Sequence, residues 1–359
     1  MARIKVRKGM PSVTLTKALF AERLKERFYD PAFAPLEGEI DKIVDAAWDG
    51  YDNSRKSLVT HPAGPGYADP RCELSDEWRA QREAVRQAER QQKSPSSKSR
   101  VLLINGSPRS DHTCPGEMSK SFRLMEIAER VIKRERGFEV ERLELNRQTS
   151  EFGIQIYPCK ACVSTAMPLC HWPCSCYPNH SLGQVNDWMQ AIYPMWAAAH
   201  GVMIVTPIHW YQAPTVLKAM IDRLVCADGG NPDPTSTSGK DAQKAKDLEM
   251  KGWDYPRHLA GRAFAVVVHG DSAGAESLRR SLSDWLGDMG LLSAGHKATI
   301  DRYVGYYEPY AEGHLGLDAD RAFQEETRNA ARALVKAVKL LRKGDFPQPD
   351  AGLKDPRPM

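Results

Sequence analysis

Residues 101–115 read VLLINGSPRSDHTCP, and this stretch decides the predicted fold. Its first four residues form a short, continuous apolar run that ends in Asn105-Gly106, a pattern typical of a parallel strand buried on both faces. Helical apolar spacing follows over about residues 115–136, with Pro115 in the first turn and Met118 on the apolar face. The stretch therefore predicts a strand, a hydroxyl-rich loop and a helix.

The same alternation continues along the chain after residue 115. Further runs that predict strands occupy residues 138–145, 201–205, 263–268 and, more weakly, 298–301. Helical spacing follows at about residues 214–225, 275–289 and 319–341. Strands that alternate with helices predict an α/β fold with a doubly wound, five-stranded parallel sheet and helices on both faces.

The first 99 residues have a different pattern. Helical spacing occupies residues 15–28, 37–51 and 77–90, and the Ser-rich segment 91–99 (QQKSPSSKS) is typical of a linker. We expect a helical N-terminal extension with its linker over residues 1–99, an α/β domain over residues 100–345 and a flexible tail over residues 346–359. Aromatic residues in the extension predict a structural or oligomerisation role.

Composition narrows the classes of protein that the chain can belong to. Of its 359 residues, 42% are hydrophobic and 27% are charged, which is ordinary for a globular protein and excludes a wholly disordered or fibrous chain. A net charge of +4 is too balanced to argue for a nucleic-acid partner. No apolar run approaches the ~20 residues that cross a bilayer, and the basic N-terminus lacks an apolar signal core. We therefore expect a cytoplasmic protein with no membrane partner.

The loop after the first strand has the chemistry of a phosphate site. Ligands of open α/β sheets bind beyond the carboxyl ends of the strands, and the N-terminus of the next helix favours an anion. Ser107 and Thr113 offer hydroxyl groups there, and Arg109 offers a cation. Neither a Gly-x-Gly-x-x-Gly nor a Gly-Lys-Ser/Thr motif is present, which leaves a single terminal phosphate as the expected ligand. The alternative is an ordinary turn that caps itself with its own hydroxyl groups.

Two more strand ends lie at the same predicted edge. After the third strand come Pro207, Ile208, His209, Trp210 and Tyr211, and after the fourth come His269, Gly270 and Asp271. Aromatic side chains can contact a flat heterocycle, and glycine lets the backbone approach a ligand. The alternative is that the aromatic residues pack internally or at an interface. Because three strand ends with this chemistry meet at one edge, we expect a bound phosphorylated ring system.

These motifs resemble two signatures of the flavodoxin-like NAD(P)H-dependent FMN reductases. The first is Gly106-Ser107-Pro108-Arg109 with Thr113, and the second is the aromatic loop followed by a helix that carries Leu217-Lys218 and Asp222-Arg223. The resemblance covers about residues 100–343. It implies a flavodoxin-like fold and an FMN-dependent oxidoreductase that passes a hydride from NAD(P)H, through the flavin, to a small acceptor such as a quinone.

The resemblance also implies roles for individual residues. Ser107, Arg109 and Thr113 would hold the FMN phosphate, and residues 207–211 and 269–271 would border the isoalloxazine ring. No catalytic side chain is implied, because the flavin carries the chemistry. His209 is expected to contact the ring, with proton donation as the alternative. Flavodoxin-like reductases are often oligomeric, so a homo-oligomer is expected by analogy.

Five of the eight cysteines fall between residues 159 and 176. Such a cluster in a protein that is not exported is more often metal-binding or redox-active than disulfide-bonded. We predict Cys159, Cys162, Cys170 and Cys174 as ligands, with Cys176 as an alternate. An iron–sulfur centre, as in the similar iron–sulfur flavoproteins, a zinc site and a group of reduced buried thiols all remain open.

These options define two alternative functions. One is an iron–sulfur flavoprotein that carries electrons to a protein redox partner, and the other is a non-enzymatic interaction protein stapled by zinc.

A second open question concerns the polar segment 228–252, which is rich in turn-forming residues. It is either a lid over the active edge or a disordered insertion.

Overall fold

The computed structural model describes residues 4, 9–10, 13–114, 119–305, 308–309 and 312–347. The predicted helical positions Pro115 and Met118, and residues 348–359 of the predicted tail, lie outside the described residues. The chain forms two compact units, each assembled from separate segments. The first unit comprises Met1–Ala84, Gln155–Gln190 and Gly229–Pro256, and the second comprises Val85–Ile154, Ala191–Asp228 and Arg257–Met359.

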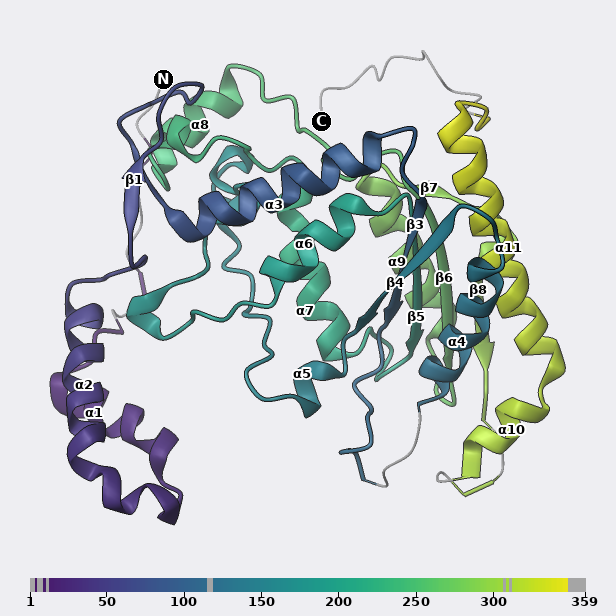
Figure 1. Ribbon diagram of the computed structural model, residues 1–359, viewed down its shortest axis with the longest axis horizontal. Helices are drawn as coiled ribbons and strands as arrows, with labels where there is room; N and C mark the ends of the chain where they lie inside the picture. Colours follow the sequence, from purple (N-terminus) through teal and green to yellow (C-terminus); the bar gives the residue numbers. More distant parts are fainter. Residues whose placement is uncertain are drawn as a thin grey trace. The chain divides into compact units, whose positions relative to one another are not determined.

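A parallel β-sheet organises the second unit (Figure 1). Its strands are β3 (Ser99–Asn105), β4 (Phe138–Glu144), β5 (Gly201–Pro207), β6 (Ala263–Gly270), the two-residue β7 (Leu292–Ser293) and β8 (Thr299–Tyr303). The order is β4-β3-β5-β6-β8, with β7 pairing with the first residues of β6. Counted along the chain, the five main strands follow the order 2-1-3-4-5 of flavodoxin-like folds. The predicted fold class is therefore confirmed, and β7 is an addition to it.

Helices cover both faces of this sheet. They are α4 (Lys120–Lys133), α5 (Arg147–Ser150), α6 (Met189–Ala198), α7 (Thr215–Arg223), α9 (Ala275–Asp288), α10 (Gly313–Ala319) and α11 (Arg321–Lys343). Figure 1 shows α4 and α11 on one face and α6, α7 and α9 on the other. Because both faces are covered, β3 is a continuous apolar run whose residues 101–104 are fully buried.

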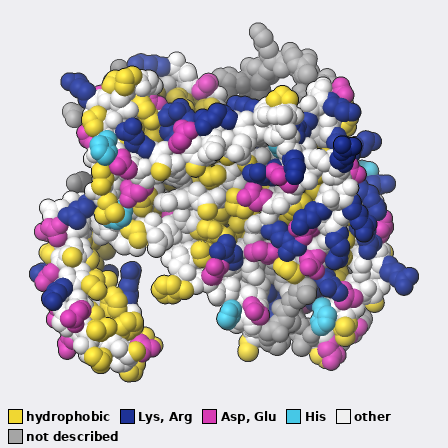
Figure 2. All heavy atoms as spheres, viewed as in Figure 1, with side chains coloured by type: hydrophobic (Ala, Val, Ile, Leu, Met, Phe, Trp, Pro, Cys, Tyr) yellow, Lys and Arg dark blue, Asp and Glu magenta, His cyan; other side chains and the backbone are white. Residues whose placement is uncertain are grey.

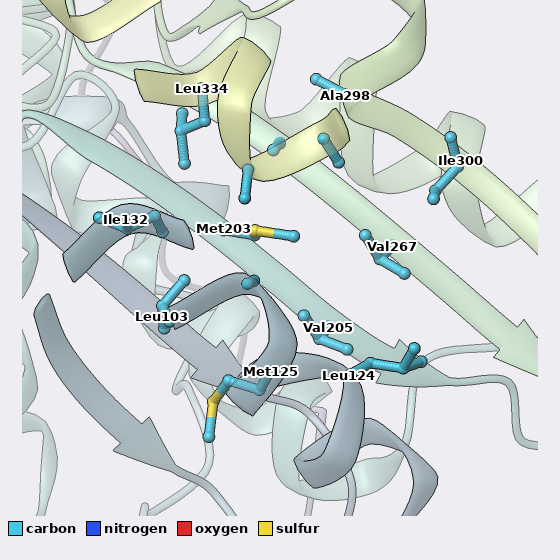
Figure 3. Packing of buried hydrophobic residues seen from close by; sticks show 14 of the residues in the cluster. Leu103, Leu124, Met125, Ile132, Met203, Val205, Val267, Ala298, Ile300 and Leu334 are labelled. Carbon is cyan, nitrogen blue, oxygen red and sulfur yellow. The ribbon is translucent and has the colours of Figure 1, made fainter. Parts of the chain in front are cut away.

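The core beneath α4 and α11 fixes the position of the sheet's carboxyl edge. Leu103, Met203 and Val267 project from three adjacent strands into one layer (Figure 3). Leu124 of α4 and Leu334 of α11 pack on that layer, and both are fully buried. Close packing of this kind ties the N-terminus of α4 to the ends of β3, β5 and β6.

Helix α6 has no counterpart among the predicted elements. Its sequence, MQAIYPMWAA, is apolar on nearly every side and contains Pro194, so it lacks the amphipathic period that reveals a surface helix. Tyr193 donates a hydrogen bond to the carbonyl of Arg223 at 2.9 Å, and the ring of Trp196 contacts that of Trp285. Helix α6 was therefore not predictable from the spacing of its apolar residues.

The first unit contains helices, short turns and one small β-hairpin. Its elements include α1 (Lys17–Lys25), α2 (Glu37–Asp52), β1 (Thr60–Pro62), β2 (Glu73–Ser75), the 3-10 turns η1 (Glu26–Phe28), η2 (Pro31–Leu36), η3 (Cys162–Ser164), η4 (Met167–Leu169), η5 (His180–Leu182) and η7 (Pro234–Thr237), and α8 (Ala242–Met250). Helix α3 (Asp76–Lys93) continues from this unit into the second. Since η7 and α8 lie in the segment 228–252, the alternative of a disordered insertion is wrong, and the lid stays a prediction.

Helices α1 and α2 expose an unusual amount of apolar surface. Phe20 contacts Trp48 and Tyr51, and ion pairs join Lys17 to Asp45 and Lys25 to Asp41. Figure 2 shows hydrophobic side chains over these helices. Leu19 of α1 and Ile43 of α2 are exposed, and so are Tyr29, Phe33 and Leu36 in the segment between them. This surface agrees with a structural or oligomerisation role, which stays a prediction. Among the helices that the structure describes, none has both the length and the apolar character needed to cross a bilayer.

Candidate functional site

The loop after β3 is held in shape by its own hydrogen bonds. The side chain of Asn105 accepts the backbone N–H of Ser107 at 3.1 Å, and the Ser107 hydroxyl accepts the N–H of Arg109 at 3.2 Å. The Thr113 hydroxyl accepts the N–H of Ser110 at 3.0 Å, so it serves the loop itself. Gly106 lies so close to β5 that a Cβ there would be 2.6 Å from Oγ1 of Thr206. The loop is therefore shaped before any ligand binds.

Helix α4 begins at the same edge of the sheet. Ser119 caps it by accepting the N–H of Phe122 at 3.0 Å, and Lys120 is its first residue. A helix N-terminus presents N–H groups without intrahelical partners and a partial positive charge. Sequence reasoning placed the start of this helix too early and missed Ser119, Lys120 and Ser121. The signal was the cap residue Ser119 directly before the amphipathic run.

The end of β5 carries a strained aromatic turn. His209 and Gln212 exchange backbone hydrogen bonds of 3.0 and 2.8 Å, which leaves Trp210 and Tyr211 at the two central positions. Both have positive φ angles, 44° and 65°, which cost energy in residues with a side chain. Trp210 is 91% exposed and Tyr211 60%. The turn therefore holds two large aromatic side chains in solvent, in a backbone conformation that costs energy.

The end of β6 contributes a neutral, buried histidine. His269 is 4% exposed, and its Nε2 lies 2.7 Å from Oγ of Ser121. Burial, with the nearby charges of Lys120 and His209, lowers the pKa of His269 to about 3. Burial also lowers the pKa of His209. His269 therefore carries no charge at neutral pH and serves to tie the end of β6 to the start of α4.

These strand ends and the start of α4 enclose one pocket with a volume of about 100 Å³. Of the predicted site residues, Ser107, Arg109, Pro207, Ile208, His209, His269, Gly270 and Asp271 line it. Ser119, Lys120, Ser121 and Val304 complete the lining. Thr113, Trp210 and Tyr211 do not line it. Two cationic side chains, Arg109 and Lys120, and one anionic side chain, Asp271, line the pocket, so it favours an anionic ligand.

The five clustered cysteines, residues 159–176, form a separate group in the first unit. Sγ of Cys162 lies 3.3 Å from Sγ of Cys176, and this hydrogen bond, with help from Lys240, lowers the pKa of Cys162 to about 6. Burial alone would lower the pKa of Lys240, but it is raised by the thiols of four cysteines: Cys176, Cys162, Cys174 and Cys170. Sγ of Cys159 accepts the N–H of Ala161 at 3.4 Å.

The arrangement of these thiols differs from that of a single-ion site. Among the described residues, which include all eight cysteines, no three His, Cys, Asp or Glu side chains converge around one metal ion. His171, a further candidate ligand by type, uses both ring nitrogens, with Oγ of Ser175 at 2.5 Å and Oγ1 of Thr237 at 3.1 Å. A metal held by the predicted ligands Cys159, Cys162, Cys170 and Cys174 stays a prediction.

Comparisons with known proteins connect the pocket to a family. Residues 99–304, more than half of the chain, match the family described as NADPH-dependent FMN reductase. A curated relative, the iron-sulfur flavoprotein of Methanosarcina thermophila, is 23% identical over 244 residues, which cover 68% of this chain and 97% of that protein.

Two solved structures are similar at low sequence identity. RosB, with the bound intermediate 8-demethyl-8-formylriboflavin-5′-phosphate, has a TM-score of 0.48 and 16% identity, and the match covers 69% of this chain and 82% of RosB. The apo form of the NADH:FMN oxidoreductase EMOB has a TM-score of 0.34 and 15% identity, with 71% and 99% covered. Such values carry no functional argument. The family match, in contrast, spans β3 to Val304 and so includes every lining residue of the pocket. The chain therefore belongs to the NADPH-dependent FMN reductase family of enzymes.

Proposed function

We propose that the second unit binds FMN with the phosphate in this pocket and passes electrons from NAD(P)H to a small acceptor such as a quinone. The observation that carries the proposal is the meeting of the ends of β3, β5 and β6 with the N-terminus of α4. Ser107, Arg109 and Lys120 all line that point, and together with the N–H groups of α4 they suit a phosphate dianion.

The residues around the pocket would then have distinct tasks. Flavin, when bound, supplies the hydride and electron chemistry. A pocket of about 100 Å³ accommodates the phosphate end of such a ligand, so the ring extends towards the turn of Trp210 and Tyr211. These exposed aromatic side chains offer a stacking surface for a nicotinamide or a flat acceptor. His209, neutral at pH 7, contacts the ring, and no side chain is needed as a general acid.

An FMN titration of the full-length protein tests the phosphate site. A charge-assisted hydrogen bond contributes about 1.5–3 kcal/mol, so Arg109→Ala and Lys120→Ala should each weaken FMN binding about 10- to 100-fold. Riboflavin, which lacks the phosphate, is the second probe, and its affinity should not change in either variant. Lys133→Ala, at the other end of α4, is the matched control. Equal weakening of FMN and riboflavin, or no FMN binding by the wild type, would overturn the proposal.

A kinetic measurement tests the reaction. Under anaerobic conditions, NADPH or NADH should bleach the bound flavin, and a quinone should restore its absorption. Steady-state oxidation of the nicotinamide should then depend on the quinone concentration. A flavin that binds but is not reduced by either nicotinamide would rule out the proposed hydride donor while leaving the binding site intact.

The cysteine group favours a second candidate function, that of an iron–sulfur flavoprotein electron carrier with a protein redox partner. The thiols of four cysteines raise the pKa of Lys240. The M. thermophila relative is named an iron-sulfur flavoprotein. This candidate predicts iron and acid-labile sulfide besides flavin, and slow reduction by nicotinamides. A non-enzymatic, zinc-stapled protein fits less well, because the chain belongs to a family of enzymes and the described thiols do not converge on a single ion.

A further inference from the structure

Two cysteines of the first unit have their sulfur atoms in contact. Sγ of Cys162, the first residue of η3, lies 3.3 Å from Sγ of Cys176, and both are free thiols. A disulfide bond is about 2.05 Å long, so the two sulfurs are only about 1.2 Å farther apart than bonded ones. Neither residue lines the pocket at the sheet edge, so the proposed FMN site does not account for their proximity.

The backbone near both cysteines is held in place by contacts of its own. Tyr177, which follows Cys176, donates a hydrogen bond to the carbonyl of Pro158 at 2.7 Å, four residues before Cys162. On the other side, Cys162 packs against the small buried cluster of Ala166, Leu169 and Ala245. Because these contacts join the two segments close to the cysteines, the sulfurs can bond with little movement of the backbone.

The two thiols differ in their access to solvent. Cys162 is half-buried, whereas Cys176 is only 8% exposed. A dissolved oxidant therefore reaches Cys162 first, and the sulfur of Cys176 waits directly behind it. An accessible cysteine next to a buried resolving cysteine is the usual arrangement of a redox-active pair.

The surroundings of the pair favour a disulfide over a metal ion. A structural metal site requires further ligands besides two thiolates. Within the described part of the chain, no three His, Cys, Asp or Glu side chains surround one ion. Formation of a disulfide needs no third side chain, and the pair already has the partner that it requires.

We infer that Cys162 and Cys176 form a redox-active dithiol that exchanges with low-molecular-weight disulfides. This activity does not rest on the proposed reductase function. It competes with the second candidate function for Cys162, since a sulfur in a disulfide is not available as a thiolate ligand.

The exchange proceeds in two steps. The thiolate of Cys162 attacks one sulfur of the small disulfide, whose own S–S bond breaks, and the first small thiol leaves with the proton that Cys162 gave up. The sulfur of Cys176 then attacks that of Cys162 and breaks the mixed disulfide, and the second small thiol leaves with the proton of Cys176. Two electrons thus pass from the pair to the small disulfide, and the protein keeps an internal disulfide.

Equilibration with glutathione tests the inference. The full-length protein is purified anaerobically, its metal content is measured, and it is incubated in mixtures of reduced and oxidised glutathione. Free thiols are then alkylated and mapped by mass spectrometry after a digestion that cuts between positions 162 and 176. A bridge between Cys162 and Cys176 should appear, depend on the square of the glutathione concentration over that of its disulfide, and disappear with dithiothreitol. Hydrogen exchange of residues 162–176 should slow when the bridge forms.

Serine variants test the order of the two steps. Cys176→Ser should lose the bridge and accumulate a glutathione adduct on Cys162, because the resolving sulfur is missing. Cys162→Ser should lose the bridge without an adduct on Cys176, which is buried. Cys159→Ser is the matched control and should keep the full bridge, because the sulfur of Cys159 contacts the backbone of Ala161 instead.

Three results would overturn the inference. They are thiols that stay free throughout the glutathione series, a main bridge between any other two cysteines, and a metal in the purified protein that Cys162→Ser removes. Flavin binding is measured on the same samples and reports on the second unit. A protein that forms the bridge but binds no FMN would refute the proposed reductase function and leave the dithiol in place.

Discussion

The pocket at the sheet edge, proposed as the FMN site, and the cysteine loop (residues 159–176) are built in opposite ways. The pocket lies where three parallel strands end and α4 begins, so regular elements with a shared core hold each lining residue in place. The cysteine loop consists of 3-10 turns and irregular backbone, held by side chains such as Asn231 and His171. One site depends on the sheet, and the other depends on a few polar side chains.

This difference explains how each site should respond to change. A sheet edge is shaped by packing that exists without any ligand, so the pocket should survive the loss of single hydrogen bonds. The cysteine loop contains little regular secondary structure, so loss of one buried polar side chain should destabilise the whole loop. Experiments that damage one unit should therefore leave the other measurably intact.

The largest effect is expected from Gly106→Val. The new side chain would start 2.6 Å from Oγ1 and 2.7 Å from Cβ of Thr206, and 3.0 Å from Cδ2 of Leu217. The phosphate loop must then move away from β5, so FMN affinity should fall more than 100-fold, with a stability loss of about 1–3 kcal/mol. Isothermal titration with FMN measures the first and urea unfolding the second.

Gly287→Ala is the control for this prediction. Gly287 lies in α9, and a Cβ added there would meet nothing within 4 Å, so alanine should stabilise the helix by about 1 kcal/mol. If the Gly106→Val variant binds FMN with wild-type affinity, the close contact between Gly106 and β5 is not needed for the FMN site. Hydrogen exchange of residues 155–190, in contrast, should be the same in both variants, because the cysteine loop belongs to the other unit.

The next effect concerns the cysteine loop. Asn231 is 1% exposed, donates to the carbonyl of Pro168 and to Oγ of Ser236, and accepts the N–H of Asp233. Asn231→Ala removes the partner of the Pro168 carbonyl, which is buried, and of the Asp233 N–H, and should cost about 3 kcal/mol. Hydrogen exchange of residues 155–190 should accelerate, while FMN affinity changes less than twofold. The exposed Asn53→Ala is the control; equal loss of protection in both units would contradict the proposed independence.

The pocket at the sheet edge was predictable from the sequence because its determinants are local. An apolar run such as residues 101–104 marks a buried strand, and the residues that follow must lie at the sheet's carboxyl edge. Chain order alone therefore predicted that Ser107, His209 and His269 would approach one another. Lys120 was not predicted because the start of α4 was placed too early. Thr113 does not line the pocket and its hydroxyl accepts the N–H of Ser110, so its contact with the phosphate stays a prediction.

The cysteine loop was less predictable, because spacing says little about irregular backbone. Cys159 and Cys162 form the conspicuous Cys-x-x-Cys pair, yet the shortest sulfur contact joins Cys162 to Cys176, fourteen residues away. Lys240, whose pKa is raised by these thiols, comes from a segment that no local motif connects to them. Only the tertiary structure of the first unit brings them to one place.

A smaller effect on stability is expected from acidification. It concerns His200, which directly precedes β5 at the edge of the sheet opposite the pocket. His200 is 5% exposed; its Nδ1 accepts the N–H of Arg100, and its Nε2 donates to the carbonyl of Gln92. Burial and the charge of Arg342 lower its pKa to about 4, below the value of about 6.5 in an unfolded chain. The neutral form is the stabilising one, so stability is complete above pH 6.5 and falls as the pH approaches 4.

Between pH 7.5 and pH 5 this group should cost the second unit roughly 2 kcal/mol of unfolding free energy. Urea unfolding at both values, followed by flavin release, measures the change. His200→Gln should be less stable at pH 7.5 but lose less on acidification, because no ring is left to protonate. The exposed His296→Gln should keep the wild-type dependence. An unchanged dependence in His200→Gln would assign the acid sensitivity to other groups.

The smallest effect on stability is expected at Trp210, and it bears most directly on how the pocket is used. Because the side chain is 91% exposed, Trp210→Ala should change the unfolding free energy by less than about 0.5 kcal/mol. Trp210→Gly should be at least as stable as the alanine variant, since glycine adopts the φ of 44° without strain. In most other positions the order of the two variants would be reversed.

FMN affinity should change less than threefold in both Trp210 variants, because the side chain does not line the phosphate pocket. The KM for a quinone should rise several-fold if the ring forms the stacking surface of the acceptor, with the rate of flavin reduction by NADPH as the companion measurement. A stable protein with unchanged KM values would show that the strained turn has no part in substrate binding. A loss of more than about 1 kcal/mol would show instead that Trp210 packs against the protein, because an exposed side chain cannot contribute that much. The backbone strain at this exposed turn destabilises the protein and is not offset by packing of the Trp210 side chain. The KM values of the Trp210 variants therefore decide whether the sheet edge binds FMN alone or also binds the reaction partners.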